Sequence, residues 1–84
     1  MRLTKPTIHL NGTSAARLYE ELDEARRLAR ELLRALDDCT PNVRDYCPQG
    51  PDVFSTAHMG HTARIDAVRQ ILLELSELQE HVAT

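Results

Sequence analysis

The chain has 84 residues and a formal net charge of −3, and it contains no Trp and one Phe. A domain of this length has a small core and is marginal unless disulfides, a metal or a partner chain adds burial. Its mixed charges lack the basic field of a non-specific nucleic-acid binder, and no apolar run reaches the roughly 20 residues of a membrane span. We therefore expect one all-α domain over residues 1–84, which self-associates as a homodimer or a larger helical bundle.

Two cysteines, Cys39 and Cys47, are present, and no apolar segment follows a basic start. Neither feature is typical of a secreted protein, so we expect a cytoplasmic one. In a reducing cytoplasm a disulfide between the two cysteines is disfavoured.

Residues 1–12 predict a short extended arm, because β-branched and apolar residues alternate after Pro6. An isolated strand leaves its backbone groups unpaired, so the arm is expected to need a neighbour, such as the same arm of a second subunit. A turn with candidate helix caps follows, formed by Asn11, Gly12, Thr13 and Ser14.

Residues 13–39 predict the first helix, because apolar residues recur there in alternating steps of three and four. The predicted seam consists of Ala15, Leu18, Leu22, Ala25, Ala29, Leu32, Leu36 and Cys39. Leu28, Leu33 and Ala35 widen this stripe, so the helix can contact more than one neighbouring helix.

Residues 40–50 predict an irregular loop that joins two antiparallel helices, because two prolines, an Asn and a Gly interrupt any regular pattern. Residues 51–82 predict the second helix, with Gly50 at its cap and Pro51 at its first position. Its predicted seam consists of Phe54, Ala57, His61, Arg64, Val68, Ile71, Leu75, Leu78 and Val82. Gly60 is expected to let the first turns fray or bend.

The positions of His61 and Arg64 fall where the second seam should be apolar. A buried His or Arg needs a partner, which can be an acidic residue, a carbonyl or an anionic ligand. In one interpretation Arg64 extends to the surface and His61 bonds a loop carbonyl. In the other, both side chains face a ligand.

The loop offers a second group of candidate ligand-binding residues, namely Arg44, Asp45, Tyr46, Gln49 and Gly50. A guanidinium can bind phosphate, an aromatic ring can stack on a base, and amide and carboxylate groups can bond base or ribose edges. The alternative is that these are ordinary polar loop residues, with Arg44 paired to Asp45 or to a helix end.

Both helices also begin with a turn that suits an anion, at residues 11–14 and 49–52. Within one hairpin these turns lie at opposite ends. In an antiparallel homodimer the first turn of one subunit comes near the loop of the other, which predicts a composite site at each end of the dimer.

A metal site and an enzyme are less well supported by the residues. Cys39, Cys47, His58 and His61 lack the spacing of structural zinc sites, so no metal is expected. Cys47 with a histidine lacks an orienting acid and an oxyanion turn, so we expect no enzyme and no cofactor.

Four segments carry a resemblance, namely Thr7-Ile-His-Leu-Asn-Gly-Thr-Ser14, Asn42-Val-Arg-Asp-Tyr46, Pro48-Gln-Gly-Pro51 and His61-x-x-Arg64. Together they resemble a group of small phage and prophage proteins, mostly of unassigned function. In size and helical architecture the chain is also similar to phage sponge proteins that sequester nucleotide-type immune signals as homo-oligomers.

This resemblance implies a phage-encoded, non-catalytic anti-defence protein in the cytoplasm of the host bacterium. It would bind a small anionic, nucleotide-type signal at the composite sites of an oligomer. The alternative function is a protein-interaction module that inhibits a host defence complex or bridges phage and host proteins.

Overall fold

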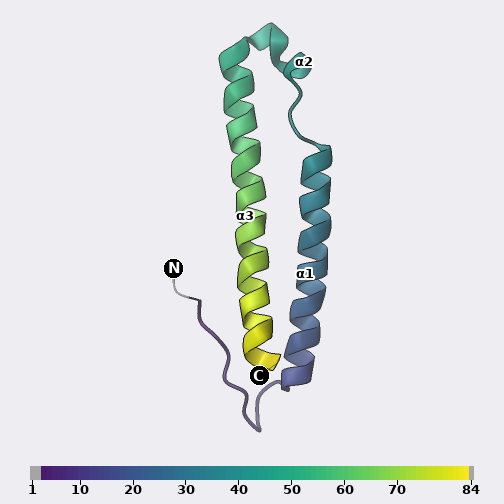
Figure 1. Ribbon diagram of the computed structural model, residues 1–84, viewed down its shortest axis with the longest axis vertical. Helices are drawn as coiled ribbons and strands as arrows, with labels where there is room; N and C mark the ends of the chain where they lie inside the picture. Colours follow the sequence, from purple (N-terminus) through teal and green to yellow (C-terminus); the bar gives the residue numbers. More distant parts are fainter. Residues whose placement is uncertain (1–2, 84) are drawn as a thin grey trace.

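The computed structural model describes residues 3–83, and Figure 1 shows two long helices joined by a short helical connection. The long helices α1 (Ala15–Asp38) and α3 (Pro51–Ala83) lie side by side and run in opposite directions. Between them stand α2 (Val43–Tyr46) and the 3₁₀ helix η1 (Cys47–Gln49). The prediction of an all-α fold is confirmed, since residues 3–83 contain no strand.

Three residues of the predicted domain lie outside the described residues. They are the first two residues of the predicted arm and the last residue of the chain, namely Met1, Arg2 and Thr84. The described chain is elongated, with extents of 61 × 24 × 17 Å. This shape follows from helix length, because 33 residues of α3 span about 50 Å at 1.5 Å per residue.

Helix α1 begins and ends at side-chain caps. The Oγ of Ser14 accepts a hydrogen bond from the backbone N–H of Arg17 at 3.2 Å, so Ser14 is the capping residue. At the other end, the hydroxyl of Thr40 donates to the carbonyl of Asp37 at 2.8 Å. The helix therefore lies within the predicted range 13–39, shorter by two residues at its start and by one at its end.

The side of α1 that meets α3 carries a stripe of half-buried apolar residues. These are Ala15, Leu18, Leu22, Ala25, Ala29, Leu33 and Leu36. The predicted seam is wrong at Leu32 and Cys39, which are both exposed. A strict heptad stripe drifts around a straight helix of 3.6 residues per turn, and a second four-residue step, from Ala29 to Leu33, corrects this drift.

The buried stripe of helix α3 also contains an extra four-residue step, from His61 to Ile65. Its buried or half-buried stripe consists of Phe54, Ala57, His61, Ile65, Val68, Leu72, Leu75, Gln79 and Val82. Arg64 and Ile71 are exposed, and the residues that follow them in the chain take their predicted places, while Leu78 of the predicted seam is half-buried. The helix is continuous through Gly60, contrary to the expected fraying or bending, because packing on both sides outweighs a penalty of about 1 kcal/mol.

The connection is helical rather than irregular, which corrects the prediction for residues 40–50. The Oδ1 of Asn42 accepts a hydrogen bond from the backbone N–H of Arg44 at 2.9 Å and so caps α2. Gly50 then turns the chain with a φ of +102°, a conformation that glycine adopts without steric cost. Its N–H donates to the carbonyl of Cys47 at 3.2 Å. Local caps therefore override the turn-rich composition.

The N-terminal segment before α1 packs against α3 of its own chain (Figure 1). The Nζ of Lys5 lies 3.7 Å from a carboxylate oxygen of Glu77, and the carbonyl of Pro6 accepts a hydrogen bond from Nε2 of His81 at 2.8 Å. The described part of the predicted arm is thus not a strand, and its contacts do not depend on a second subunit.

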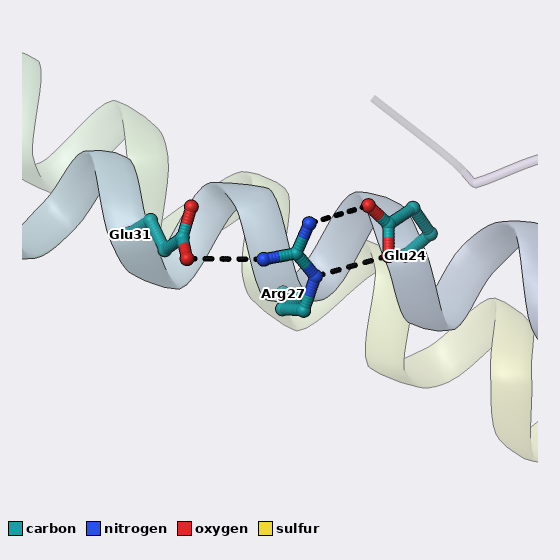
Figure 2. A network of polar contacts seen from close by, with 3 residues as sticks. All are labelled: Glu24, Arg27 and Glu31. Carbon is teal, nitrogen blue, oxygen red and sulfur yellow. Dashed lines mark hydrogen bonds and ion pairs between the residues drawn. The ribbon is translucent and has the colours of Figure 1, made fainter.

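The outer face of α1 carries an ion-pair network, shown in Figure 2. The guanidinium of Arg27 makes two hydrogen bonds to Glu24, at 2.6 and 3.0 Å, and one to Glu31 at 3.0 Å. The hydrogen bond from Arg27 holds the pKa of Glu24 below its usual range, and Glu24 in turn raises the pKa of Arg27. These groups are exposed, so salt screens the network and its contribution to stability is small.

The core between the two long helices is thin. Among residues 3–83 the buried apolar side chains are Val68 and Val82, and the buried polar ones are His61 and Gln79. The chain exposes 6568 Å², whereas a globular monomer of its mass exposes about 5,000 Å². The difference of about 1,500 Å² means that the helix pair leaves much more surface uncovered than a compact monomer does.

Candidate functional site

Helix α3 extends past the end of α1 (Figure 1). A pocket of about 580 Å³ opens there, beside the connection. We call it the loop-end pocket. It is lined by Leu36, Cys39, Pro41, Tyr46, Thr56, Ala57, Gly60, His61 and Arg64. Helix α1, the connection and α3 all contribute side chains, so this pocket depends on the tertiary fold rather than on one segment.

His61 lies at the base of the loop-end pocket and is 5% exposed. Its Nε2 is 3.5 Å from the hydroxyl oxygen of Thr40, whose own proton is directed to the carbonyl of Asp37. The hydroxyl oxygen therefore accepts a hydrogen bond from the imidazole N–H. The expected partner of His61 was a loop carbonyl, and the observed partner is a hydroxyl group.

Replacing Thr40 by Val should lower the free energy of unfolding by about 1 kcal/mol, because at nearly constant volume it removes both the partner of the buried imidazole of His61 and the hydroxyl that bonds the carbonyl of Asp37. The melting temperature should fall by roughly 4–8 °C. Circular dichroism on heating measures this. The exposed Thr62→Val is the matched control, and an equal change in both variants would contradict the assigned role.

Arg64 lies at the surface of the loop-end pocket, which corrects its predicted place in the seam. A Cβ at Gly60 would lie 3.8 Å from Nη1 and 3.9 Å from Nη2 of Arg64, so the guanidinium stands over the glycine backbone. Within residues 3–83 no carboxylate pairs with Arg64. The pocket thus holds a guanidinium whose charge is not neutralised by a neighbour.

Tyr46 forms an aromatic wall of the same pocket. Its ring centroid lies 6.1 Å from that of Phe54, with an interplanar angle of 56°, and Phe54 is in turn 5.9 Å from His58. Tilted packing of this kind fixes the orientation of a ring. Tyr46, His61 and Arg64 are therefore three predicted site residues that the fold brings together.

The other predicted site residues lie elsewhere. In the connection, Arg44, Asp45, Gln49 and Gly50 do not line the pocket, and the side chain of Arg44 bonds Asn42 rather than Asp45. The turn of Asn11, Gly12, Thr13 and Ser14 lies at the opposite end of the molecule (Figure 1). One chain therefore does not unite the two predicted turns, and a composite site needs a second chain.

Polar groups lie between the two long helices, where the sequence pattern predicted apolar ones. Gln79 is 3% exposed, and its Nε2 donates to Oδ1 of Asp23 at 3.1 Å and to the carbonyl of Tyr19 at 3.3 Å. The guanidinium of Arg26 donates to Oε1 of Gln79. We call these four residues the polar seam cluster. The sequence did contain a pattern that indicates burial of Gln79, because Gln79 lies four residues after Leu75 and three before Val82.

A second hollow, which we call the arginine groove, runs between the long helices and has a volume of about 380 Å³. It is lined by Arg26, Arg30, Arg69, Leu72, Leu73 and Ser76. The Nε of Arg26 is buried without a hydrogen-bond partner, and Arg69 has a carboxylate only at 3.9 Å, from Asp66. Arg26 likewise has a carboxylate only at 3.9 Å, from Asp23, so in the described part of the chain these three arginines have no ion pair shorter than 3.9 Å.

Comparison with protein-family models, with curated proteins and with solved structures finds no match to this chain. In the described part of the chain, no three His, Cys, Asp or Glu side chains are grouped so that they could hold a metal ion. No helix there is long and apolar enough to cross a membrane. The loop-end pocket and the exposed surfaces are therefore the features of the molecule that bear on its function.

Proposed function

We propose that the protein is a non-catalytic binding protein that holds a small anionic, nucleotide-type ligand in the loop-end pocket. The observation that supports this is the meeting of Tyr46, His61 and Arg64 in one pocket of about 580 Å³. Small-molecule sites typically measure about 300–1,000 Å³ and combine apolar walls with a few polar groups. A guanidinium suits a phosphate, and an aromatic ring suits a base.

The cysteine that lines the pocket, Cys39, is not hydrogen-bonded to His61, which supports a binding role. The thiol of Cys39 donates to the carbonyl of Leu36 at 3.4 Å, while Nε2 of His61 faces Thr40. The thiol and the imidazole therefore have separate partners, whereas a catalytic nucleophile needs its base within hydrogen-bond reach.

The biological role that we propose follows from the resemblance to small phage proteins. A phage-encoded protein of this kind lowers the concentration of a host defence signal in the bacterial cytoplasm by binding it without turning it over. Sequestration needs high affinity, and a site completed by a second copy of the chain can supply additional contacts to the anion.

Isothermal titration calorimetry with ADP-ribose and with a cyclic dinucleotide tests the proposal. The protein should bind at least one of them, and Arg64→Ala should weaken binding about 10–100-fold, because a charge-assisted hydrogen bond is worth about 1.5–3 kcal/mol. Tyr46→Ala should also weaken it, through loss of stacking. Arg34→Ala, an exposed arginine outside the pocket, should bind as the wild type does. Wild-type protein that binds neither probe would overturn the proposal.

The arginine groove favours a second candidate, a protein-interaction module that inhibits a host defence complex or bridges phage and host proteins. Its apolar lining, rimmed by Arg26, Arg30 and Arg69, matches an amphipathic helix with acidic flanks. Leu73 in this groove is 66% exposed, which leaves it accessible to such a helix. This candidate becomes the better one if the calorimetry above shows no nucleotide binding.

A further inference from the structure

An unpartnered apolar surface lies on the side of the helix pair away from the arginine groove. Leu28 and Leu32 of α1 are each 50% exposed, and Ile71 of α3 is 47% exposed. Residues three or four apart lie on one face of a helix, so Ala35 continues the row of α1 and Ala67 that of α3. We call these five residues the leucine face.

The leucine face is continuous with the loop-end pocket. The row of α1 leads from Ala35 to Cys39, and the row of α3 leads from Ala67 to Arg64 and Gly60, each in steps of three or four. These last three residues line the pocket. Whatever covers the leucine face therefore also lies at the edge of the pocket.

The exposed area and the charges indicate what covers this face. The chain as a whole exposes about 1,500 Å² more than a globular monomer of its mass, and a stable dimer interface, which buries about 800 Å² per partner, would cover part of this excess. A two-fold axis brings the same surface of both copies together. Through the arginine groove it would bring arginines against arginines, whereas the leucine face pairs apolar side chains.

We propose that a second copy of the chain packs on the leucine face, antiparallel, about a two-fold axis at the level of Leu28 and Ile71. Tyr19 and Gln79 lie at the same height along the helix pair, because the carbonyl of Tyr19 is bonded to Gln79. Ser14 precedes Tyr19 by five residues and so lies about 7.5 Å nearer the end of the molecule where α1 begins. Ser14 is thus about 20 Å from Ile71 along the helix axis. The two-fold axis places Ser14 of the second copy about 20 Å from Ile71 in the opposite direction. It then lies at the height of His58, beside the loop-end pocket.

This inference deepens the proposed function, since it identifies the surface that forms the composite site. Size-exclusion chromatography with light scattering should give a mass of two chains for the wild type and of one chain for Leu32→Glu. Leu73→Glu places the same charge on the arginine-groove side and should remain dimeric. Circular dichroism checks that each variant keeps its helix content. A monomeric wild type, or a monomeric Leu73→Glu beside a dimeric Leu32→Glu, would overturn the inference.

Cross-linking tests the orientation without disturbing the interface. Chains in which Cys39 and Cys47 are replaced by Ser carry either Ser14→Cys or Thr56→Cys, and the two are mixed and oxidised. A disulfide that joins one chain of each kind is expected, and only like-to-like disulfides would contradict the antiparallel arrangement. A monomeric protein that binds a nucleotide would overturn this inference and leave the proposed function standing. A dimeric protein that binds none would overturn the proposed function and leave this inference standing.

Discussion

Val68→Asp should unfold the helix pair. Val68 is 7% exposed and lies on the stripe of α3 that packs on α1, so the new carboxylate would be buried without a partner. Its burial costs several kcal/mol, a large part of the roughly 4–13 kcal/mol that a chain of this length has available. Circular dichroism at 222 nm should show most of the helical signal lost at 25 °C.

The matched control for this substitution is Gln70→Asp, two residues further along α3 on an exposed position. It introduces the same charge and the same helix propensity without burial, and it should retain the wild-type signal. Equal loss of helix in both variants would mean that α3 is sensitive to charge in general and that Val68 is not a core residue.

Gln79→Ala should lower the free energy of unfolding by roughly 1–3 kcal/mol, because it leaves Arg26 and Asp23 without their common hydrogen-bond partner between the helices. The melting temperature should fall by roughly 5–15 °C. Urea denaturation followed by circular dichroism measures the change.

Two further variants separate hydrogen bonding from volume at this position. Gln79→Leu retains the side-chain volume and should also destabilise the protein, because partly buried Arg26 loses its bond to Gln79 and keeps only the carboxylate of Asp23, at 3.9 Å. Gln70→Ala, an exposed glutamine on the same helix, should change stability by less than about 0.5 kcal/mol. A Gln79→Ala variant as stable as Gln70→Ala would show that the polar seam cluster contributes nothing.

Much of the fold could be predicted from the sequence, because periodic apolar residues determine which face of a long helix is buried. The predicted stripe of α1 holds from Ala15 to Ala29. It fails at Leu32, because a strict seven-residue repeat drifts around a straight helix and by Leu32 has moved off the face that contacts α3. The helical connection was missed because its prolines and glycine suggested a loop, while the cap supplied by Asn42 has a weaker signal.

The candidate site could be predicted only in part, because a pocket depends on which segments meet in space. His61 and Arg64 were found as polar residues near an apolar stripe, and Tyr46 as an aromatic residue in the connection. Cys39 and Gly60 have no such signal. They line the pocket only because α3 extends past the end of α1. The difference in length between two helices cannot be read from the residues around either position.

The proposed dimer would link the folding of this chain to its own concentration. In an assembly through the leucine face, part of the apolar burial that stabilises the helices is supplied by another chain, so the folded fraction rises with the amount of protein by mass action. Chains present at low abundance unfold more often and are removed sooner by proteases. Such a protein would accumulate only when its rate of synthesis is high enough for dimers to form. Its concentration would then determine whether it can act.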